Sequence, residues 1–245
     1  MTARAPAAFG MSRQPGERWT RFATRIANAF GLVLVLVLLT YVLASVTPYS
    51  GWTAVLIVVV SSASAAVGLT SAEARPWLVR WGIRLAGVAV LLAIVNAAFG
   101  SSVSLGLSSL LEMLLLLVAA GAVLRAVITE TEVGFRTILG AISVYIVFAL
   151  LFTFLYVGID RLQSGVFFAG DPHTQTGDYV FFSITTLTTT GYGNLVPAAQ
   201  PGEMFSGLEM FIGQIFVVTL IAGLVSLWRP GQRARDRRRQ DGDSA

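Results

Sequence analysis

A threonine-rich segment that ends in Gly-Tyr-Gly has the residue types expected of a site that binds a cation through backbone oxygens. Residues 188–194 read Thr-Thr-Thr-Gly-Tyr-Gly-Asn. Successive backbone carbonyl groups that point towards one axis can replace the water around a cation. This arrangement needs backbone angles, including positive φ, that glycine adopts without steric penalty. Cation coordination is therefore predicted for Thr189, Thr190, Gly191, Tyr192 and Gly193, and the hydroxyl group of Thr189 can add an oxygen at the inner end.

The elements around this segment are predicted to be membrane-spanning helices. Of the 245 residues, 55% are hydrophobic and 12% are charged, and the mean hydropathy is +0.74. A soluble globular domain has about 25% charged residues. Runs of about 20 apolar residues are long enough to cross a bilayer as helices. Six such runs occur, at residues 27–46, 52–70, 82–99, 106–128, 137–158 and 203–228.

A shorter apolar stretch at residues 178–188 comes directly before the Gly-Tyr-Gly segment. It is too short to cross a bilayer. Asp178 is the expected N-cap of a helix there. Such a helix would enter the membrane and turn back, with its partly negative C-terminal end favouring a cation.

The order of the motifs in this part of the chain is distinctive. The aromatic-led sequence Tyr179-Val180-Phe181-Phe182-Ser183-Ile184-Thr185-Thr186 precedes the Gly-Tyr-Gly segment, while Pro197 and an apolar helix with Gly213 in its middle follow it. From about Ala141 to Trp228, the chain resembles the pore domain of the tetrameric potassium channels, most closely the bacterial two-helix ion-channel pore family. The resemblance implies a selectivity filter at residues 189–193 that binds K⁺, with no other metal and no cofactor.

This resemblance also implies the fold class and the assembly. The expected fold is an all-α integral membrane protein with six transmembrane helices, and with a re-entrant pore helix and a selectivity-filter loop between spans five and six. One filter segment cannot surround an ion, so four chains are expected to form a closed homotetramer in the lipid bilayer.

Two positions depart from the commonest form of the family's motif. Thr190 stands where valine is usual, and Asn194 stands where aspartate is usual. At Thr185 many relatives carry a glutamate that pairs with that aspartate, so the acidic pair is absent here. Thr185, Asn194 and Asp178 are the predicted supports of the filter, while Tyr192 is expected to pack behind it. The hydroxyl group of Thr190 needs a hydrogen-bond partner, and the strength of K⁺ over Na⁺ selectivity is left open.

Four parts of the chain are predicted from these patterns. They are a basic N-terminal segment (1–26), a four-span membrane domain (27–128), a pore domain (137–228) and a basic tail (229–245). The pore domain comprises an outer helix, the pore helix 178–188, the filter 189–193 and the inner helix 203–228.

The distribution of arginine predicts the orientation in the membrane. Arginines precede the first span and follow the second, fourth and sixth spans, whereas the loops Thr47–Gly51 and Phe99–Leu105 carry no charge. Since cytoplasmic loops hold the positive charge, both termini are predicted to be cytoplasmic in the plasma (inner) membrane, with the filter facing outwards. The arginines of residues 233–239 either bind anionic lipid headgroups or only fix the topology.

Few arginines are placed where they could sense voltage. A voltage sensor needs about three to four gating charges per subunit. The fourth span has Arg125 alone, at its inner end, and Arg80 and Arg84 lie at the membrane entrance of the third span. Weak or no intrinsic voltage sensing is therefore predicted.

Two acidic residues lie well inside predicted spans, where burying a charged group is costly and an acidic residue is therefore a candidate for a functional role. Glu112 is predicted to pair with Asn96, in either a structural or a pH-sensing role. Glu209 lies on the inner helix, about 140° around the helix axis from Gln214. It is predicted to brace the outer helix through Thr153 or Tyr156.

The inner helix supplies the predicted gating and cavity residues. Gly213 matches the family's hinge position, whereas Gly223 is predicted to serve close helix packing. The expected cavity lining consists of Gln214, Val217, Val218 and Ile221.

The predicted function is passive conduction of K⁺. A non-selective cation channel, made possible by Thr190 and Asn194, and a non-conducting membrane sensor or scaffold are the alternatives. A transporter would show inverted repeats and broken paired helices, and neither is visible. No enzyme is expected because the sequence shows no nucleophile–base pair or metal constellation, and no nucleic-acid partner is expected.

Overall fold

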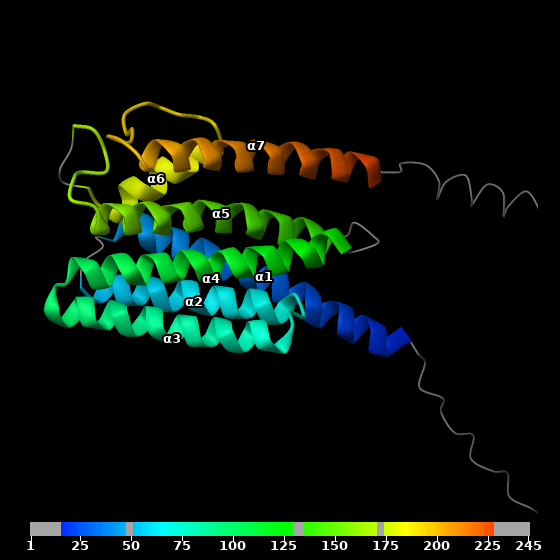
Figure 1. Ribbon diagram of the computed structural model, residues 1–245. Helices are drawn as coiled ribbons and strands as arrows, with labels where there is room; N and C mark the ends of the chain where they lie inside the picture. The colour runs from blue at the N-terminus through cyan, green and yellow to red at the C-terminus, as the bar shows by residue number, and fades with distance from the viewer. Residues whose placement is uncertain (1–15, 48–50, 130–134, 171–173, 228–245) are drawn as a thin grey trace, which may run out of the picture.

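Helices make up most of the protein in the computed structural model, which describes residues 16–47, 51–129, 135–170 and 174–227 (Figure 1). Among these residues the β-structure is limited to one isolated bridge. In chain order the helices are α1 (Gly16–Val46), α2 (Trp52–Ser71), α3 (Pro76–Phe99), α4 (Ser102–Thr129), α5 (Phe135–Leu162), α6 (Thr176–Leu187) and α7 (Gly202–Leu227). The predicted all-α fold class is confirmed.

The lengths and apolar character of the helices fit a membrane protein. Five described segments are long and apolar enough to cross a membrane: Trp52–Ser71, Pro76–Phe99, Ser102–Thr129, Thr137–Leu162 and Gly202–Leu220. The first predicted span lies in α1, whose apolar part, Phe30–Val46, is shorter than these five. With 12 residues, α6 is too short to cross a bilayer, as predicted for a re-entrant helix.

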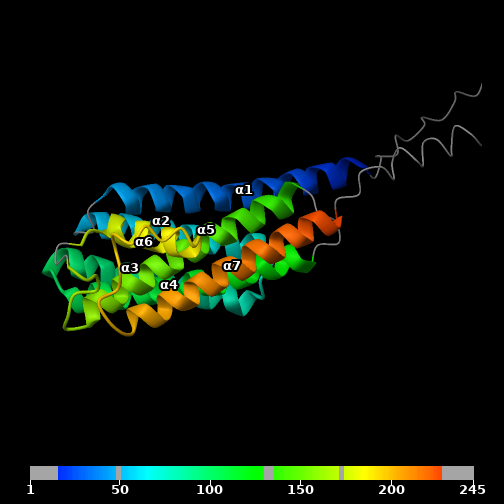
Figure 2. The same cartoon turned by 90° about the horizontal axis from the view of Figure 1, so that it is seen from above.

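Helix α5 lies at the centre of the bundle and contacts α1, α4, α6 and α7. In Figures 1 and 2, α3 and α7 lie on opposite sides of the molecule. The short helix α6 contacts α1, α5 and α7. The start of α1 and the end of α7 lie at one end of the bundle, and the loop after α6 lies towards the other (Figure 1). The pore helix therefore has a helix of the N-terminal domain as one of its neighbours.

Several helices are longer than the predicted spans. Helix α1 begins at Gly16 rather than at 27, α3 begins at Pro76 rather than at 82, and α5 ends at Leu162 rather than at 158. Apolar composition marks the part of a helix that suits the bilayer, whereas the helix itself continues until a cap or a breaker ends it. In α3 the start is set by Pro76, which occupies the first turn, where its missing N–H is not needed.

Small residues bring α4 and α5 close together. A Cβ atom on Gly158 of α5 would lie 2.6 Å from Cδ2 of Leu110, and one on Gly106 of α4 would lie 2.7 Å from Cγ of Leu162. Between helices in lipid, such close packing replaces the hydrophobic effect as the source of association. One core cluster extends over both the four-span part and the pore part, and includes Val37, Ile57, Leu115 and Leu150. The two parts are therefore packed as a single bundle.

Candidate functional site

The Gly-Tyr-Gly segment has an alternating backbone conformation. The φ angle is +56° at Thr189, +51° at Gly191 and +78° at Gly193, but it is not positive at Thr190 or Tyr192 between them. Alternating left- and right-handed residues turn successive N–H groups to one side of the chain, and hence successive carbonyl groups to the other. Thr189 adopts its positive φ despite having a Cβ, which is uncommon. This alternation of φ is the pattern expected of a column of carbonyl oxygens, and coordination of a cation by residues 189–193 stays a prediction.

The start of this segment is hydrogen-bonded to the C-terminal end of α6. The N–H groups of Thr190 and Gly191 donate to the carbonyl oxygen of Thr185, at 2.8 and 3.1 Å, and the N–H of Thr189 donates to Thr186 at 2.9 Å. Thr185, a predicted support, thus contacts the filter through its backbone, because its hydroxyl group donates to Phe182 at 3.0 Å. A movement of the end of α6 would be passed directly to these residues.

The hydroxyl group of Thr190 has a hydrogen-bond partner, as predicted from the sequence. Its Oγ1 lies 2.8 Å from Oγ1 of Thr188. Thr188 donates to the carbonyl of Ile184 at 2.7 Å, so the hydrogen between the two threonines comes from Thr190. The hydroxyl group of Thr189 donates to the carbonyl of Thr188 at 2.7 Å. Thr188 was not singled out in the sequence.

Tyr192 packs on the pore helix. Its ring stacks on that of Phe181, with the centroids 5.7 Å apart and an angle of 17° between the planes. The tyrosine is nevertheless 72% exposed within one chain. Asn194, the other unusual filter position, is exposed on the loop. The filter segment therefore leaves most of its outer surface uncovered in a single chain.

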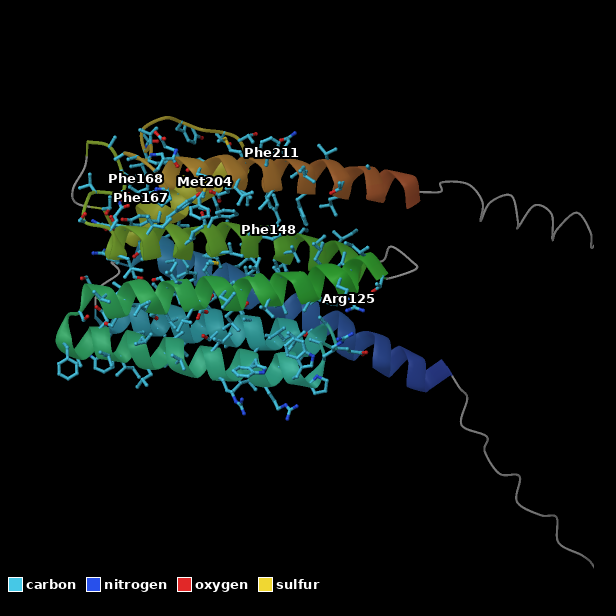
Figure 3. The ribbon with its side chains drawn as sticks, viewed as in Figure 1. Arg125, Phe148, Phe167, Phe168, Met204 and Phe211 are labelled. Atoms are coloured by element: carbon cyan, nitrogen blue, oxygen red, sulfur yellow. The ribbon has the colours of Figure 1, made fainter. Side chains whose placement is uncertain are left out.

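The outer end of the loop is held by the segment before α6. The N–H of Ala169 donates to Val196 at 2.9 Å, and the N–H of Ala198 donates to Phe167 at 2.8 Å, on either side of the bridge between Phe168 and Pro197. Phe167 and Phe168 point into the bundle beside α6 (Figure 3). They form an aromatic cluster with Tyr156, Tyr179 and Phe182, with ring centroids 4.9–6.2 Å apart. Both ends of the filter loop are thus fixed to the pore domain.

Asp178 stabilises the start of α6, but it is not the N-cap that was predicted. The helix begins at Thr176, and Gln175 is its N-cap. Asp178 occupies the third helical position and accepts a hydrogen bond of 2.7 Å from the N–H of Gln175. This hydrogen bond is the acidic half of a capping box. The motif was not predicted from the sequence, because its N-cap residue is usually serine or threonine and here it is glutamine.

We expect D178A to destabilise the protein by about 1 kcal/mol, the typical loss when a capping side chain is removed. The measurement is the thermal unfolding of the purified protein. D178N keeps an oxygen acceptor at the same position and should lose less stability than D178A. Equal unfolding temperatures for D178A and the unchanged protein would show that the 2.7 Å hydrogen bond contributes no stability.

Gly213 lies directly against the pore helix. A Cβ atom at this position would lie 2.1 Å from the carbonyl oxygen of Leu187, the last residue of α6. Among the described residues, a Cβ on Gly223 meets no neighbouring atom within 4 Å. The packing role predicted for Gly223 stays a prediction, whereas close packing within one chain occurs at Gly213. The register of α7 against α6 decides this, and the hinge role of Gly213 stays a prediction.

The other predicted cavity residues follow Gly213 on α7 and differ in their exposure. Gln214 and Val218 are exposed within one chain, and Val217 is half-buried. The side chain of Ile221 lies outside the described residues. A role for these residues in lining a cavity stays a prediction.

Glu209 braces the outer helix through Tyr156, one of the two predicted partners. Its Oε2 accepts a hydrogen bond of 2.6 Å from the tyrosine hydroxyl group, and its Oε1 lies 2.5 Å from the hydroxyl oxygen of Ser183. Thr153, the other predicted partner, donates to Ala149 in its own helix at 2.8 Å. Ser183 was missed as a partner, although it is a polar residue within the apolar part of α6.

Glu112 is fully buried in the four-span domain, but Asn96 is not its partner. Ser62 of α2 donates to the Glu112 carboxyl group, at 3.0 Å from Oε2. The prediction paired Glu112 of α4 with Asn96 of α3 because these two helices are consecutive in the sequence. Helix α4 instead packs against both α2 and α3, and the face that carries Glu112 meets α2.

The arginines considered for voltage sensing lie on the surface. Arg125 is exposed near the end of α4 that is remote from the filter (Figure 3). Arg80 and Arg84 are exposed on α3, and the guanidinium carbon of Arg84 lies 5.1 Å from the centroid of the Trp81 ring. The basic tail at residues 229–245 lies outside the described residues.

An outer helix, a short helix, a loop with alternating φ and an inner helix follow one another in the order expected of an ion-channel pore domain. Comparison with known families agrees, because residues 140–229 match the family described as "Ion channel". The resemblance to the potassium-channel pore domain is confirmed for this part of the chain.

Curated proteins with similar sequences are named as potassium channels. Two pore potassium channel c of Oryza sativa subsp. japonica is 33% identical over 82 residues, which cover 32% of this chain and 18% of that protein. Potassium voltage-gated channel protein shk-1 of Caenorhabditis elegans is 30% identical over 95 residues, or 37% of this chain and 18% of that protein. The matches therefore span less than a fifth of these relatives. No solved structure matches the chain significantly.

Proposed function

We propose that the protein is a potassium-selective channel that conducts K⁺ passively through a homotetrameric pore. The observation that carries the proposal is the alternating φ of residues 189–193 together with the hydrogen bonds that Thr190 and Gly191 donate to Thr185. Dehydrated K⁺ needs several carbonyl oxygens around it, and one chain supplies only one column of them. Four chains around a four-fold axis would complete the ring.

Uncovered apolar residues in the pore domain are consistent with this assembly. Helix α7 contacts only α5 and α6 among the described helices. Phe211, Ile215 and Val218 of α7 are more than half exposed, and Phe211 points away from α5 in Figure 3. These side chains and the exposed ring of Tyr192 are apolar groups that further copies of the chain would cover.

The membrane placement and gating follow from the arginines. We place the protein in the plasma (inner) membrane with both termini cytoplasmic, since its arginines follow the positive-inside rule. The surface positions of Arg80, Arg84 and Arg125 accord with weak or no voltage sensing. K⁺ in the filter is the only metal that this function requires.

The test is the current through a planar bilayer that contains the purified protein, with K⁺ on one side and Na⁺ on the other. A reversal potential near the potassium value is expected. G191A is the control, because an alanine at φ +51° is strained by about 1–2 kcal/mol and should lose the selectivity.

The same experiment separates the other candidate functions. A robust current that reverses near zero would establish a non-selective cation channel, which the threonine at 190 and the asparagine at 194 favour. Silence across voltage, pH and lipid composition would instead favour a membrane sensor or scaffold.

A further inference from the structure

A buried carboxyl group joins the three helices of the pore domain. Glu209 of α7, Tyr156 of α5 and Ser183 of α6 each have 0% of their surface exposed. The tyrosine hydroxyl group donates to Oε2 of Glu209 at 2.6 Å, and the hydroxyl oxygen of Ser183 lies 2.5 Å from Oε1. A polar group buried this deeply is costly unless it is bonded, so this group specifies how the three helices meet.

The contact between α6 and α7 has two points that are one helical turn apart. Ser183 and Leu187 are four residues apart on α6, and they face Glu209 and Gly213, which are four residues apart on α7. Residues with this spacing lie on the same face of a helix. The carboxyl group therefore holds α6 at Ser183, while the glycine allows the carbonyl group of Leu187 to approach the backbone of α7.

This contact is close in sequence to the residues that hold the filter. Thr185, two residues after Ser183, accepts the N–H groups of Thr190 and Gly191. If α6 rotated about its axis or shifted along it, the carbonyl group of Thr185 would move, and the start of the filter would move with it. The hydrogen bonds of Glu209 thus act on the filter through one helix and one carbonyl group.

The hydrogen-bond donors and acceptors around Glu209 suggest two substitutions to compare, one that can keep the hydrogen bonds and one that cannot. The hydroxyl oxygen of Ser183 lies 2.7 Å from the carbonyl oxygen of Ala149 as well as 2.5 Å from Oε1 of Glu209, but the hydroxyl group has one hydrogen. A glutamine at 209 could donate from its amide nitrogen to Ser183 and accept from Tyr156 with its amide oxygen. A leucine of similar size could do neither.

We propose that Glu209 is a positioning residue for K⁺ selectivity, and that it acts by fixing the pore helix to the inner and outer helices through Ser183 and Tyr156. The inference rests on the proposed channel function and adds to it a residue that never touches the ion. Glu209 is remote from the filter in sequence and on a different face of α7 from Gln214, the residue expected to meet the permeating ion.

The first experiment compares the K⁺/Na⁺ permeability ratios of E209L, E209Q, S183A and Y156F with that of the unchanged protein. E209L is expected to lower the ratio about tenfold, equivalent to about 1.4 kcal/mol. S183A and Y156F should lower it less, and E209Q should lower it less than E209L. E112Q changes an equally buried glutamate outside the pore domain, and S143A changes a buried serine that bonds only to its own helix. Both should keep the unchanged ratio.

Loss of selectivity must be separated from loss of folding. A merely structural role would lower the unfolding temperature or the yield of assembled protein in E209L and leave the permeability ratio unchanged, which would overturn the proposal. If E209L does not assemble, the permeability ratios of S183A and Y156F decide whether Glu209 has a positioning role, because each of these substitutions removes only one hydroxyl group from the network. An unchanged ratio in both would also overturn the proposal, as would an E209Q ratio as low as that of E209L.

A second measurement does not depend on conduction. Hydrogen exchange of the peptide that contains Thr190 and Gly191 reports the opening of their hydrogen bonds to Thr185. In E209L this peptide should exchange at least several-fold faster, while peptides of α3 should not change. Unaltered exchange would refute the positioning role. If the unchanged protein shows no K⁺ selectivity, only the proposed potassium-selective function is refuted, because the exchange measurement would still decide whether Glu209 positions the filter.

Discussion

G213A is expected to abolish potassium-selective conduction. A Cβ at this position would lie 2.1 Å from the carbonyl oxygen of Leu187 and 3.0 Å from its carbonyl carbon. These are backbone atoms at the end of α6, so no side chain can rotate away. The two helices must separate, at a cost on the order of 1–3 kcal/mol or more for overpacking. The higher helix propensity of alanine would return only about 1 kcal/mol.

The measurement for G213A is the current in the bilayer assay together with thermal unfolding. G207A is the matched control, because a Cβ on Gly207 of the same helix meets no atom within 4 Å in the part of the chain that the structure describes. The experiment also separates packing from hinge motion. A packing role predicts a lower unfolding temperature, whereas a hinge role predicts a stable protein whose opening is altered. A stable G213A protein with unchanged current would contradict both.

G177A is expected to weaken the attachment of the pore helix to the N-terminal domain. A Cβ on Gly177, near the start of α6, would lie 2.8 Å from the carbonyl oxygen of Ser45 at the end of α1. This contact is also between backbones, and relieving it should cost about 1–3 kcal/mol. The expected result is a lower unfolding temperature and a smaller potassium current.

The control for G177A is G87A in α3, where an added Cβ meets no atom of the described residues within 4 Å. G177A should have less effect on selectivity than G213A, because Leu187 is close to the filter residues and Gly177 is at the other end of α6. If G177A unfolds at the same temperature as G87A, the contact between α1 and α6 is not a close one.

The local features of the pore domain were predictable because each depends on a short stretch of sequence. The glycines at 191 and 193 indicate the filter loop, and the long apolar runs indicate the spans. The short apolar stretch before the filter indicates the re-entrant helix. Helical periodicity also indicated that Glu209 braces the outer helix, since its position relative to Gln214 excludes the cavity, but it left the choice between Thr153 and Tyr156 open.

Other features depend on which helices meet, and sequence spacing does not contain that information. Asn96 and Glu112 are on consecutive helices, yet Glu112 bonds to Ser62 because the arrangement of the bundle turns it towards α2. The close approach at Gly213 depends likewise on the register of α7 against α6. Nothing near Gly213 in the sequence indicates that Leu187 lies opposite.

The contact of α6 with both α1 and α7 has a consequence for biogenesis. Synthesis proceeds from the N-terminus, so α1 and α5 are in the membrane before α6 leaves the ribosome. One side of the pore helix can therefore dock on completed structure, with Gly177 against Ser45. Its other side has no support until α7 has been made, because Glu209 and Gly213 belong to that last helix. The geometry of the filter is thus settled only when the final helix has been inserted.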